Sequence, residues 1–521
     1  MVIQFIRRRV GALESGGTDG EPSAKLRVPV ELLDRHEGRV LDPARAEAAG
    51  GGRPRATAYR PRVLLVPDDV LCDGAALDSV RSVLNDAGYD LDPPSGRSGA
   101  TARPVALRAL SGPDQDVDAW VALQHLRAAD VLDPDVVRRI SLEHLVFSAV
   151  TIAGTPWDTN SDQVDGSYRR SPSGASRVPV AVAGPAPRRD ELGDRFTRRP
   201  VVALLDSGIG PHPWFGIRDR SAPPPADGFI SVLDEAQQAI RDNATAAPSL
   251  LDYWDSPVLS DSLIRDVDSN TGHGTFIAGI IRQAAPSADV LAVRVMHSDG
   301  IAYGSDVIAA LEEISRRVDR AQREDRPEDM VDVVSLSLGY LDESPADSVY
   351  TTHLAEVVRR LTEQGVLVLA ASGNNSTSRR FYPAAFADLP DLPGAGPGVI
   401  SVGALNPNAT KAGFSNDGGW VTCWATGAGV VSTFPTDVSG PRQPGLADAH
   451  RSGLDPDDFR SGFAVWDGTS FATPLAAAAV ANALIDVAAA DTGLSLAAVD
   501  QETVVKRAWA ALERCYEQYE V

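Results

Sequence analysis

The chain has 521 residues, with 49 Lys or Arg against 71 Asp or Glu, so its formal net charge is −22. This acidic balance argues against a nucleic-acid-binding protein, which usually carries a basic face, and against attraction to an anionic membrane surface. The three cysteines form no disulfide framework and no CxxC metal pair. The first residues lack the apolar core of a signal peptide, and no run of about 18 apolar residues would span a membrane. We therefore expect a cytoplasmic protein without nucleic-acid or membrane partners.

The first third of the chain divides into an extension, a compact unit and a linker. Residues 1–58 are rich in Gly and polar residues and are expected to form a flexible N-terminal extension. Over 59–152, apolar patterning predicts an α+β unit with strands at 62–68, 89–92, 104–110 and 140–150 and helices at 76–88 and 117–129. That order is the split, ferredoxin-like arrangement. A linker at 153–199, rich in Ser, Pro, Gly and Arg, follows the unit.

Residues 200–490 alternate buried strands with helices. Near-continuous runs of Val, Ile, Leu and Ala predict strands at 201–206, 289–296, 331–338, 365–372 and 398–405. Helical spacing predicts helices at 305–322 and 348–365. Strands that are apolar on both faces are typical of a parallel sheet covered by helices on each side, so we expect a doubly wound, mostly parallel α/β domain. Residues 491–521 are expected to form a C-terminal helical extension.

Three segments place a reactive side chain at the end of a regular element. Asp206 ends the strand 201–206, where α/β sheets place their ligands, although Asp-Ser-Gly is also a common turn. His273 lies between two glycines at the start of a helix, where a histidine taken alone is more often a capping or solvent-facing residue. Ser470 precedes a helix and could be an ordinary N-cap; Pro474 is expected in the first turn of that helix.

Taken together, these residues indicate catalysis. Asp, His and Ser in this chain order form one of the known orders of the serine-protease triad. Asn374 follows the strand 365–372, and an amide at a strand end can donate a hydrogen bond to a developing oxyanion. No HExxH segment supports metal-dependent hydrolysis.

Four segments then resemble the motifs of the subtilisin-like serine peptidases, or subtilases: LLDSGIG around Asp206, GHGTFIAGI around His273, ASGNN around Asn374 and DGTSFATPLAAAAVA around Ser470. The resemblance implies a serine endopeptidase that acts on peptide bonds through an acyl-enzyme, with Asp206, His273, Ser470 and Asn374 as catalytic residues. It also implies a substrate-binding set formed by Gly300, Ile301, Ala302, Ser337, Leu338, Gly339, Ala371, Ser372 and Gly373.

Two departures from the family pattern affect specificity and metal binding. Phe381 precedes Tyr382-Pro383 in a region that helps to form the family's specificity pocket; the ring could shorten the pocket or pack beneath it, and packing is favoured. No cofactor is expected. Structural calcium is not supported by a recognisable motif, and the acidic stretch Asp261–Asp268 is interpreted as a solvated loop rather than a cation site.

The unit at 59–152 resembles the propeptides that precede many subtilases, which implies that it docks on the peptidase domain, blocks it, and is cut from it within the linker. An unrelated accessory or partner-binding domain is the alternative. The leading hypothesis is an intracellular endopeptidase regulated by its N-terminal region, through which a regulatory protein could act. The alternatives are a dedicated peptide-maturation protease or transpeptidase and a non-catalytic interaction protein with the subtilase fold.

Overall fold

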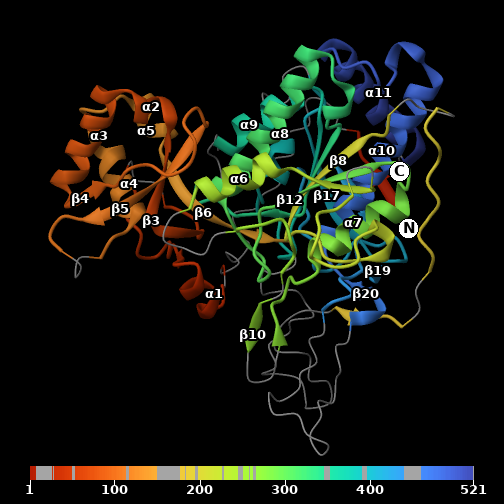
Figure 1. Ribbon diagram of the computed structural model, residues 1–521. Coiled ribbons are helices and arrows are strands. Elements are labelled where there is room, and N and C mark those ends of the chain that lie inside the picture. The colour runs from red at the N-terminus through yellow and green to blue at the C-terminus, as the bar shows by residue number, and fades with distance from the viewer. Residues whose placement is uncertain are drawn as a thin grey trace, which may run out of the picture.

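The computed structural model describes residues 1–7, 26, 28–49, 53–112, 116–149, 177–181, 184–193, 198–225, 228–244, 250–256, 258–261, 266–344, 353–389, 396–438 and 459–519. Figure 1 shows two bodies that lie side by side. We call the smaller one, residues 58–149, the N-terminal unit, and the larger one, formed mainly by the described residues from 198 onward, the large domain.

The large domain is built on one eight-stranded sheet in the order β1-β18-β17-β16-β14-β8-β12-β9. Neighbouring strands are parallel except β1, which runs antiparallel to β18 at one edge. The strands are β1 (Ile3–Phe5), β8 (Val201–Asp206), β9 (Ile230–Val232), β12 (Asp289–Arg294), β14 (Val333–Leu336), β16 (Leu367–Ala371), β17 (Val399–Leu405) and β18 (Cys423–Thr426). The predicted, mostly parallel α/β sheet is therefore confirmed.

Helices cover both faces of this sheet, as the continuous apolar strands require. On β8, Ala203 and Leu205 point into one hydrophobic cluster, while Val202 and Leu204 point into another. The first cluster includes side chains of α6 (Asp234–Asp242), α8 (Gly304–Glu324) and α9 (His353–Glu363). The second includes side chains of α7 (His273–Ala284), α10 (Thr469–Ala490) and α11 (Gln501–Tyr519).

Helix α10 runs through the second cluster. Within the described parts of the chain it is the one helix long and apolar enough to cross a membrane by length and composition, and 78% of its most apolar stretch is buried inside the protein. A helix that contacts apolar neighbours on all sides needs the same composition. Its apolar character therefore fits a place at the centre of the fold.

The N-terminal unit has its own antiparallel sheet in the order β6-β3-β5-β4. Leu64 and Val66 of β3 face a cluster with α3 and α4, whereas Leu65 joins the cluster of α8 and α9 in the large domain. One face of the sheet thus packs on its own helices and the other on the large domain. The elements are β3 (Ala58–Pro67), α2 (Asp68–Cys72), α3 (Gly74–Asp86), β4 (Tyr89–Leu91), β5 (Ala102–Ala109), α4 (Ala119–Ala128), α5 (Pro134–Arg139) and β6 (Ser141–Ser148).

The expectation of a flexible extension over residues 1–58 is wrong for the described part of that segment. Ile3–Phe5 form the edge strand β1, and the ring of Phe5 packs against Tyr516 and Tyr519 of α11. Further along, α1 (Val30–Arg35) contacts the large domain through Arg35, and β2 (Arg39–Val40) pairs with β3. An apolar stretch as short as β1 gives no periodic signal, so only its tertiary pairing shows that it is a strand.

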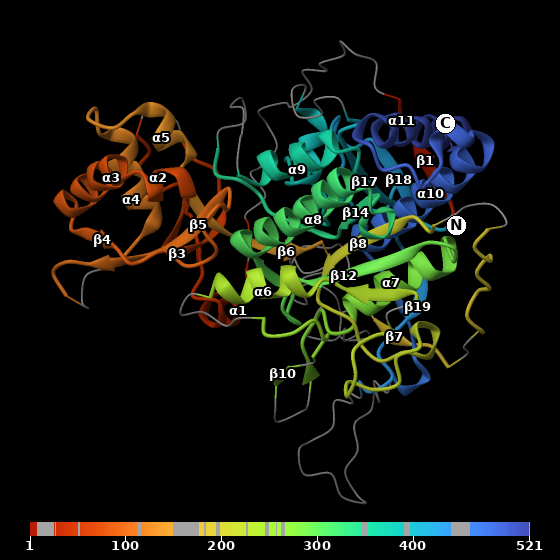
Figure 2. The same cartoon turned by 45° about the horizontal axis from the view of Figure 1, so that its top comes forward.

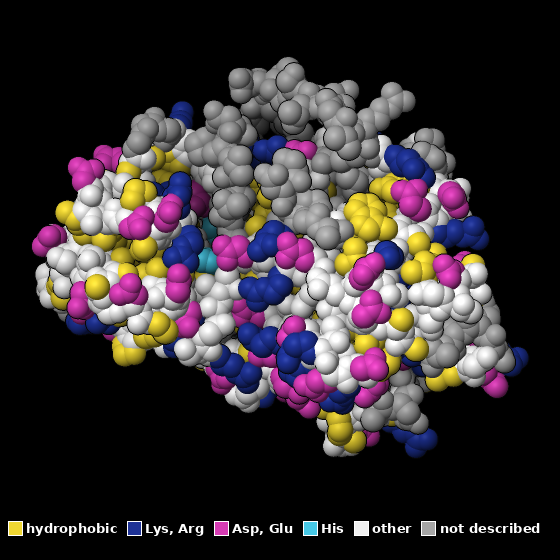
Figure 3. Space-filling view, turned by 90° about the horizontal axis from the view of Figure 1, so that it is seen from above, with side chains coloured by type: hydrophobic (Ala, Val, Ile, Leu, Met, Phe, Trp, Pro, Cys, Tyr) yellow, Lys and Arg dark blue, Asp and Glu magenta, His cyan; other side chains and the backbone are white. Residues whose placement is uncertain are grey.

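Shorter elements complete the described chain. In the predicted linker, residues 153–176 lie outside the described part, whereas β7 (Val178–Pro179) pairs with β20. On the face seen in Figure 3, basic side chains near the centre are flanked by acidic ones. The remaining elements are β10 (Leu259–Asp261), β11 (Asp266–Val267), β13 (Ile301–Tyr303), β15 (Leu338–Gly339), β19 (Val430–Thr433), β20 (Phe463–Trp466) and the 3₁₀ turns η1 (Pro213–Phe215), η2 (Pro327–Asp329), η3 (Ala384–Asp388), η4 (Phe459–Ser461) and η5 (Thr492–Leu494).

Candidate active site

Asp206 at the end of β8 and His273 at the start of α7 meet in the interior. Nδ1 of His273 lies 2.7 Å from Oδ1 of Asp206, and both side chains are buried. The same carboxylate oxygen accepts the backbone N–H of Ser207 at 2.7 Å. The carboxylate therefore fixes the ring orientation of His273 and leaves Nε2 as the nitrogen available for proton transfer.

The glycines that flank His273 are needed for close packing. Gly272 has a positive φ of 84°, and a Cβ on it would collide with the ring of Phe434. A Cβ on Gly274 would collide with the carbonyl oxygen of Gly208, in the turn that follows Asp206. Small residues on both sides thus allow the helix carrying the imidazole to approach the strand end carrying the carboxylate.

A second buried acid, Asp255, supports the same pair. Its Oδ2 accepts the backbone N–H of Gly272 at 2.7 Å and the hydroxyl of Ser207 at 3.3 Å. Burial raises the pKa of Asp255 to about 7. Asp255 lies in a loop without a recognisable motif, so sequence reasoning missed it, and only its contacts in the folded chain show that it links the segments of Asp206 and His273.

Ser470 is the second residue of α10, and its hydroxyl donates to the carbonyl of Ser337 at 3.2 Å. The expectation that Pro474 lies in the first turn is wrong, because α10 begins at Thr469 and Pro474 is its sixth residue. Proline has no N–H, so the carbonyl of Ser470, four residues earlier, lacks its intrahelical donor. The hydroxyl of Ser337 donates to that carbonyl instead, at 2.9 Å. Because the proline leaves this carbonyl open, Ser470 accepts a hydrogen bond from Ser337, which lies between β14 and β15.

Asn374 lies next to the start of α10. Its Oδ1 accepts the backbone N–H of Thr469 at 3.0 Å, which leaves the amide Nδ2 as the donor. The neighbouring Gly373 donates its backbone N–H to the hydroxyl of Thr469 at 3.2 Å. An amide donor beside a helix N-terminus, where the backbone carries partial positive charge, can stabilise an oxyanion.

His273 and Ser470 do not hydrogen-bond to each other in this structure. The hydroxyl of Ser470 donates to Ser337, and Nε2 of His273 lies 3.5 Å from the hydroxyl of Ser148, the last residue of β6. Hydrogen bonds between nucleophile and base often tighten only in the reacting complex. A residue of the N-terminal unit therefore occupies the position next to the base.

The two predicted substrate-binding strands both pair with β6. β13 and β15 run antiparallel to it on either side, and Phe147 stands opposite both Ile301 and Gly339. The backbone N–H of Ser148 donates to Gly300 at 2.8 Å, and that of Ala149 donates to Ser337 at 3.1 Å. We call the slot between β13 and β15 the binding cleft. Figure 2 shows β6 reaching from the N-terminal unit into the large domain beside α8.

The predicted residues Ala371, Ser372 and Gly373 lie beside Asn374 rather than alongside β6. Ala371 pairs with Val402 in the main sheet, and the hydroxyl of Ser372 donates to the carbonyl of Asn416 at 3.3 Å. Across the described chain, no backbone hydrogen bond joins these three residues to β6. Gly300–Ala302 and Ser337–Gly339 are thus the predicted residues that flank an extended chain here.

The described residues contain no group of three or more His, Cys, Asp or Glu side chains placed to hold a metal ion. Within the acidic stretch Asp261–Asp268, the side chain of Asp268 pairs with Arg35 at 3.0 Å and accepts the hydroxyl of Ser298 at 2.8 Å. The side chains of residues 261–266 lie outside the described part. Asp268 is therefore a structural contact with the N-terminal segment.

An Asp–His pair, a serine at a helix N-terminus, an amide donor and two strand edges together define a serine hydrolase that binds extended chains. Comparisons with known proteins agree. The Subtilase family model matches residues 197–506. Subtilisin BL of Lederbergia lenta is 29% identical over 289 residues, which cover 54% of this chain and 74% of that protein.

Two further matches either cover a smaller share of the chain or have a lower sequence identity to it. The thermophilic serine proteinase of Bacillus sp. (strain AK1) is 31% identical over 194 residues, covering 34% of this chain and 41% of that protein. A solved structure, a mutant of the protease domain of PatA, is similar with a TM-score of 0.34 and 20% identity, over 57% of this chain and 82% of that chain.

The family match spans more than half of the chain, and the chain belongs to the subtilase family. It is a subtilisin-like serine endopeptidase, a hydrolase whose substrates are peptides or proteins. The resemblance inferred from the four sequence motifs is thereby confirmed.

Proposed function

We propose that this chain is a serine endopeptidase kept inactive by its own N-terminal unit, whose last strand fills the binding cleft in the manner of a substrate. In the open enzyme, Ser470 attacks the scissile carbonyl while His273 accepts its proton and later donates it to the leaving amine. Asp206 holds the imidazole and stabilises its charged form. Asn374 and the backbone N–H of Ser470 donate to the oxyanion.

The observation that carries the proposal is the pairing of β6 with both walls of the cleft. Adding a strand between two edges is a general way for proteins to bind extended peptides. The carbonyl of Ser337 accepts hydrogen bonds from Ala149 and from the Ser470 hydroxyl, which brings Ala149 next to the nucleophile. This register supports a scissile bond directly after Ala149, just before the linker in which the maturation site was expected.

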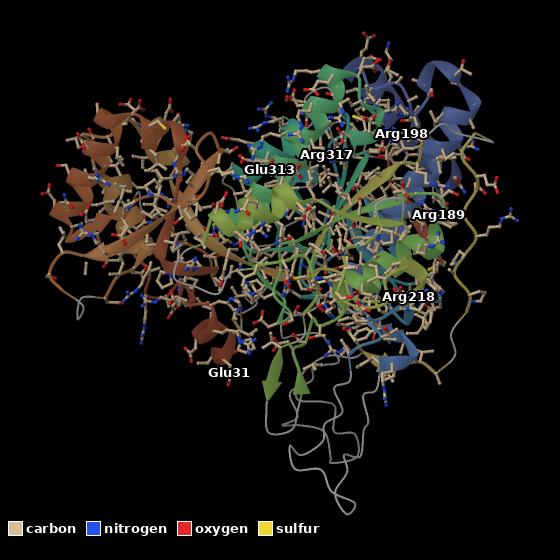
Figure 4. All side chains as sticks on the ribbon, viewed as in Figure 1. Glu31, Arg189, Arg198, Arg218, Glu313 and Arg317 are labelled. Atoms are coloured by element: carbon tan, nitrogen blue, oxygen red, sulfur yellow. The ribbon has the colours of Figure 1, made fainter. Side chains whose placement is uncertain are left out.

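Buried polar contacts support a stable docking of β6. The carboxylate of Glu143 accepts the backbone N–H of Ser305, at the start of α8, at 3.0 Å. Nε2 of His144 lies 2.8 Å from Glu343, and the imidazole stacks on Tyr340. Further from the cleft, Arg97 of the N-terminal unit pairs with Glu313 of α8 at 2.9 Å; Glu313 is labelled in Figure 4 on the side of α8 toward that unit.

A second attachment supports retention of the N-terminal unit after cleavage. Strand β1 belongs to the same N-terminal fragment as β6, yet it is the edge strand of the main sheet. Cutting after Ala149 leaves the pairing of β1 with β18 untouched. We therefore propose that residues 1–149 stay bound as a regulatory subunit and that activation needs only the withdrawal of β6.

The proposal includes a cytoplasmic location and a regulatory partner acting on the N-terminal unit. All three cysteines are free thiols, and two of them, Cys423 and Cys515, are buried, which suits a reducing compartment. A dedicated peptide-maturation role would use the same site on one restricted substrate. The non-catalytic alternative is disfavoured because all four residues that the chemistry needs are present, with Asp206 hydrogen-bonded to His273 and Asn374 hydrogen-bonded to the start of the helix that carries Ser470.

The test compares the masses of the purified wild-type chain and its Ser470→Ala variant, with N-terminal sequencing of the products. The proposal expects fragments 1–149 and 150–521 from the wild type and an intact chain from the variant. Ser231→Ala, on the edge strand β9, is the matched control and should be cut like the wild type. Identical intact masses, or the same cut in Ser470→Ala, would overturn self-processing.

A further inference from the structure

An aromatic ring lies against β15, the strand that pairs with the end of β6. Phe381 is fully buried, and its ring touches two glycines of the site, Gly339 of β15 and Gly373. A Cβ on Gly339 would collide with Cε1 of this ring, and a Cβ on Gly373 would lie 3.1 Å from its Cδ1. The ring is therefore in direct contact with two backbone segments that border the nucleophile.

Alternation along β6 determines which of its residues face this ring. Ser148 directs its hydroxyl toward His273, so its neighbour Phe147 points to the opposite face. Ala149 directly follows β6, and its N–H donates to Ser337 at 3.1 Å, so the pairing and its alternation extend to this residue. Phe147 pairs directly with Gly339, and directly paired residues of antiparallel strands share a face. Because a side chain at Gly339 would point into Phe381, the side chain of Ala149 points to the face that the ring occupies.

The backbone on both sides of Phe381 is held in place. Tyr382 exchanges two backbone hydrogen bonds with Tyr340, both of 2.9 Å, which keeps residue 381 beside β15. On the other side, the guanidinium of Arg380 pairs with Asp388 at 2.6 Å. The ring thus has little room to withdraw when a chain binds in the cleft.

We propose that Phe381 closes the subsite for the residue that precedes the scissile bond, so that this enzyme cleaves after small side chains such as Ala, Ser or Gly. The inference rests on the proposed function, because the substrate register is taken from β6. Ala149 is buried, and in this register its single methyl group is the side chain that lies at this subsite. A Phe or Leu at the same position would have to displace the ring of Phe381.

The test uses two peptidyl diphenyl phosphonate probes that differ only in an Ala or a Phe side chain at the position of Ala149. The rate at which each probe labels Ser470 in the full chain is followed by intact mass. The ratio of the two rates does not depend on how often β6 leaves the cleft. We expect the Ala probe to react at least about tenfold faster with the wild type, the size of effect that a pocket too small for a side chain produces.

Substitution of the ring should remove this preference. Phe381→Gly, and as a second variant Phe381→Ala, should bring the ratio to one or invert it in favour of the Phe probe. Phe215→Ala removes another buried ring, one that packs on His212 and Phe229, and should leave the ratio as in the wild type. Equal rates in the wild type, or an unchanged ratio in both Phe381 variants, would overturn the inference.

A small fluorophosphonate that carries no such side chain separates this inference from the proposed function. If it labels Ser470 while the ratio shows no preference, the nucleophile works and only the specificity assignment fails. If it does not label the folded protein even after long incubation, the proposed catalytic function fails and the inference fails with it.

Discussion

The large domain and the N-terminal unit hold their buried polar groups in different ways. In the catalytic site, backbone groups contribute many of the contacts: the N–H of Ser207 to Asp206, that of Thr469 to Asn374, and the carbonyl of Ser337 to Ser470. At the junction with the N-terminal unit, ionisable side chains such as those of His144 and Glu343 face each other. The comparison teaches that the catalytic geometry is built into the fold, whereas the docking depends on contacts that charge can change.

The largest effect is expected from Asp206→Asn, which acts only on the large domain. Asn keeps the shape but can hold the imidazole in the wrong tautomer and cannot stabilise its charged form. The rate of peptide hydrolysis should fall by about 10⁴-fold, as for the corresponding substitution in other triads. The measurement is kcat with an Ala-containing peptide, and Asp417→Asn, an exposed acid, is the control. A loss of less than tenfold would contradict the role of Asp206.

Asn374→Ala should have the next largest effect. It removes the amide donor but leaves the serine, histidine and aspartate in place. Loss of such a donor from a subtilisin lowers kcat by about 10²–10³-fold, and the same range is expected here with little change in KM. An equal loss confined to KM would show that Asn374 acts in substrate binding instead.

A substitution in β1 should weaken the binding of the cleaved fragment 1–149 to the large domain. Phe5 is buried against two tyrosines of α11, and replacing a buried Phe by Ala costs about 3–5 kcal/mol. After cleavage, the fragments 1–149 and 150–521 should elute together in the wild type, whereas a larger share of them should elute separately in Phe5→Ala, in which β6 is the main remaining attachment. The control is Ile6→Ala, because Ile6 is the exposed neighbour. Separation of the wild-type fragments would contradict the second attachment.

A pH dependence is also expected at the junction. Asp306 of α8 is buried, and burial together with the nearby Glu143 of β6 raises its pKa from 3.8 to about 8. A carboxyl with a raised pKa in the folded state contributes its full stability below pH 3.8, and that contribution is lost as the pH rises through about 8. Asn does not ionise, so the Asp306→Asn variant does not lose this stability as the pH rises.

The difference in Tm between Asp306→Asn and its parent, both carrying Ser470→Ala, should therefore grow from about pH 4 to about pH 8 and then level off. Asp319→Asn on the exposed side of α8 should show a small, constant difference. A constant difference for Asp306→Asn as well would mean that Asp306 is not neutral in the folded protein.

The sequence predicted the elements that have a regular apolar pattern and the residues that belong to a motif. The strand 201–206 follows from a near-continuous apolar run, the helix 305–322 follows from helical apolar spacing, and the four catalytic candidates follow from their motifs. Strand β1 and the support of Asp255 could not be predicted, because each depends on a partner far away in the chain. The position of Pro474 was wrong for a related reason: Ser337, not a neighbour in α10, satisfies the carbonyl that the proline leaves open.

The occupancy of the binding cleft also depends on tertiary structure. The segment 140–150 was predicted as a strand of the N-terminal unit and is observed as Ser141–Ser148, but its pairing with β13 and β15 has no signal in the sequence. The sequence left open two readings of Phe381, a shortened pocket or packing beneath it, and favoured packing. The contacts of the ring with Gly339 and Gly373 are the observation from which we propose the shortened pocket.

The occupied cleft is the central claim, and the labelling rate of Ser470 by a small fluorophosphonate tests it most directly. Val146 of β6 is buried and lines an apolar cavity with Leu338 and Tyr340, so Val146→Asp places a charge where it cannot be solvated. We predict labelling at least about tenfold faster than in the wild type, because the open state becomes more populated. Val121→Asp, a half-exposed position on α4, should label like the wild type. Equal labelling of Val146→Asp and the wild type would contradict the account.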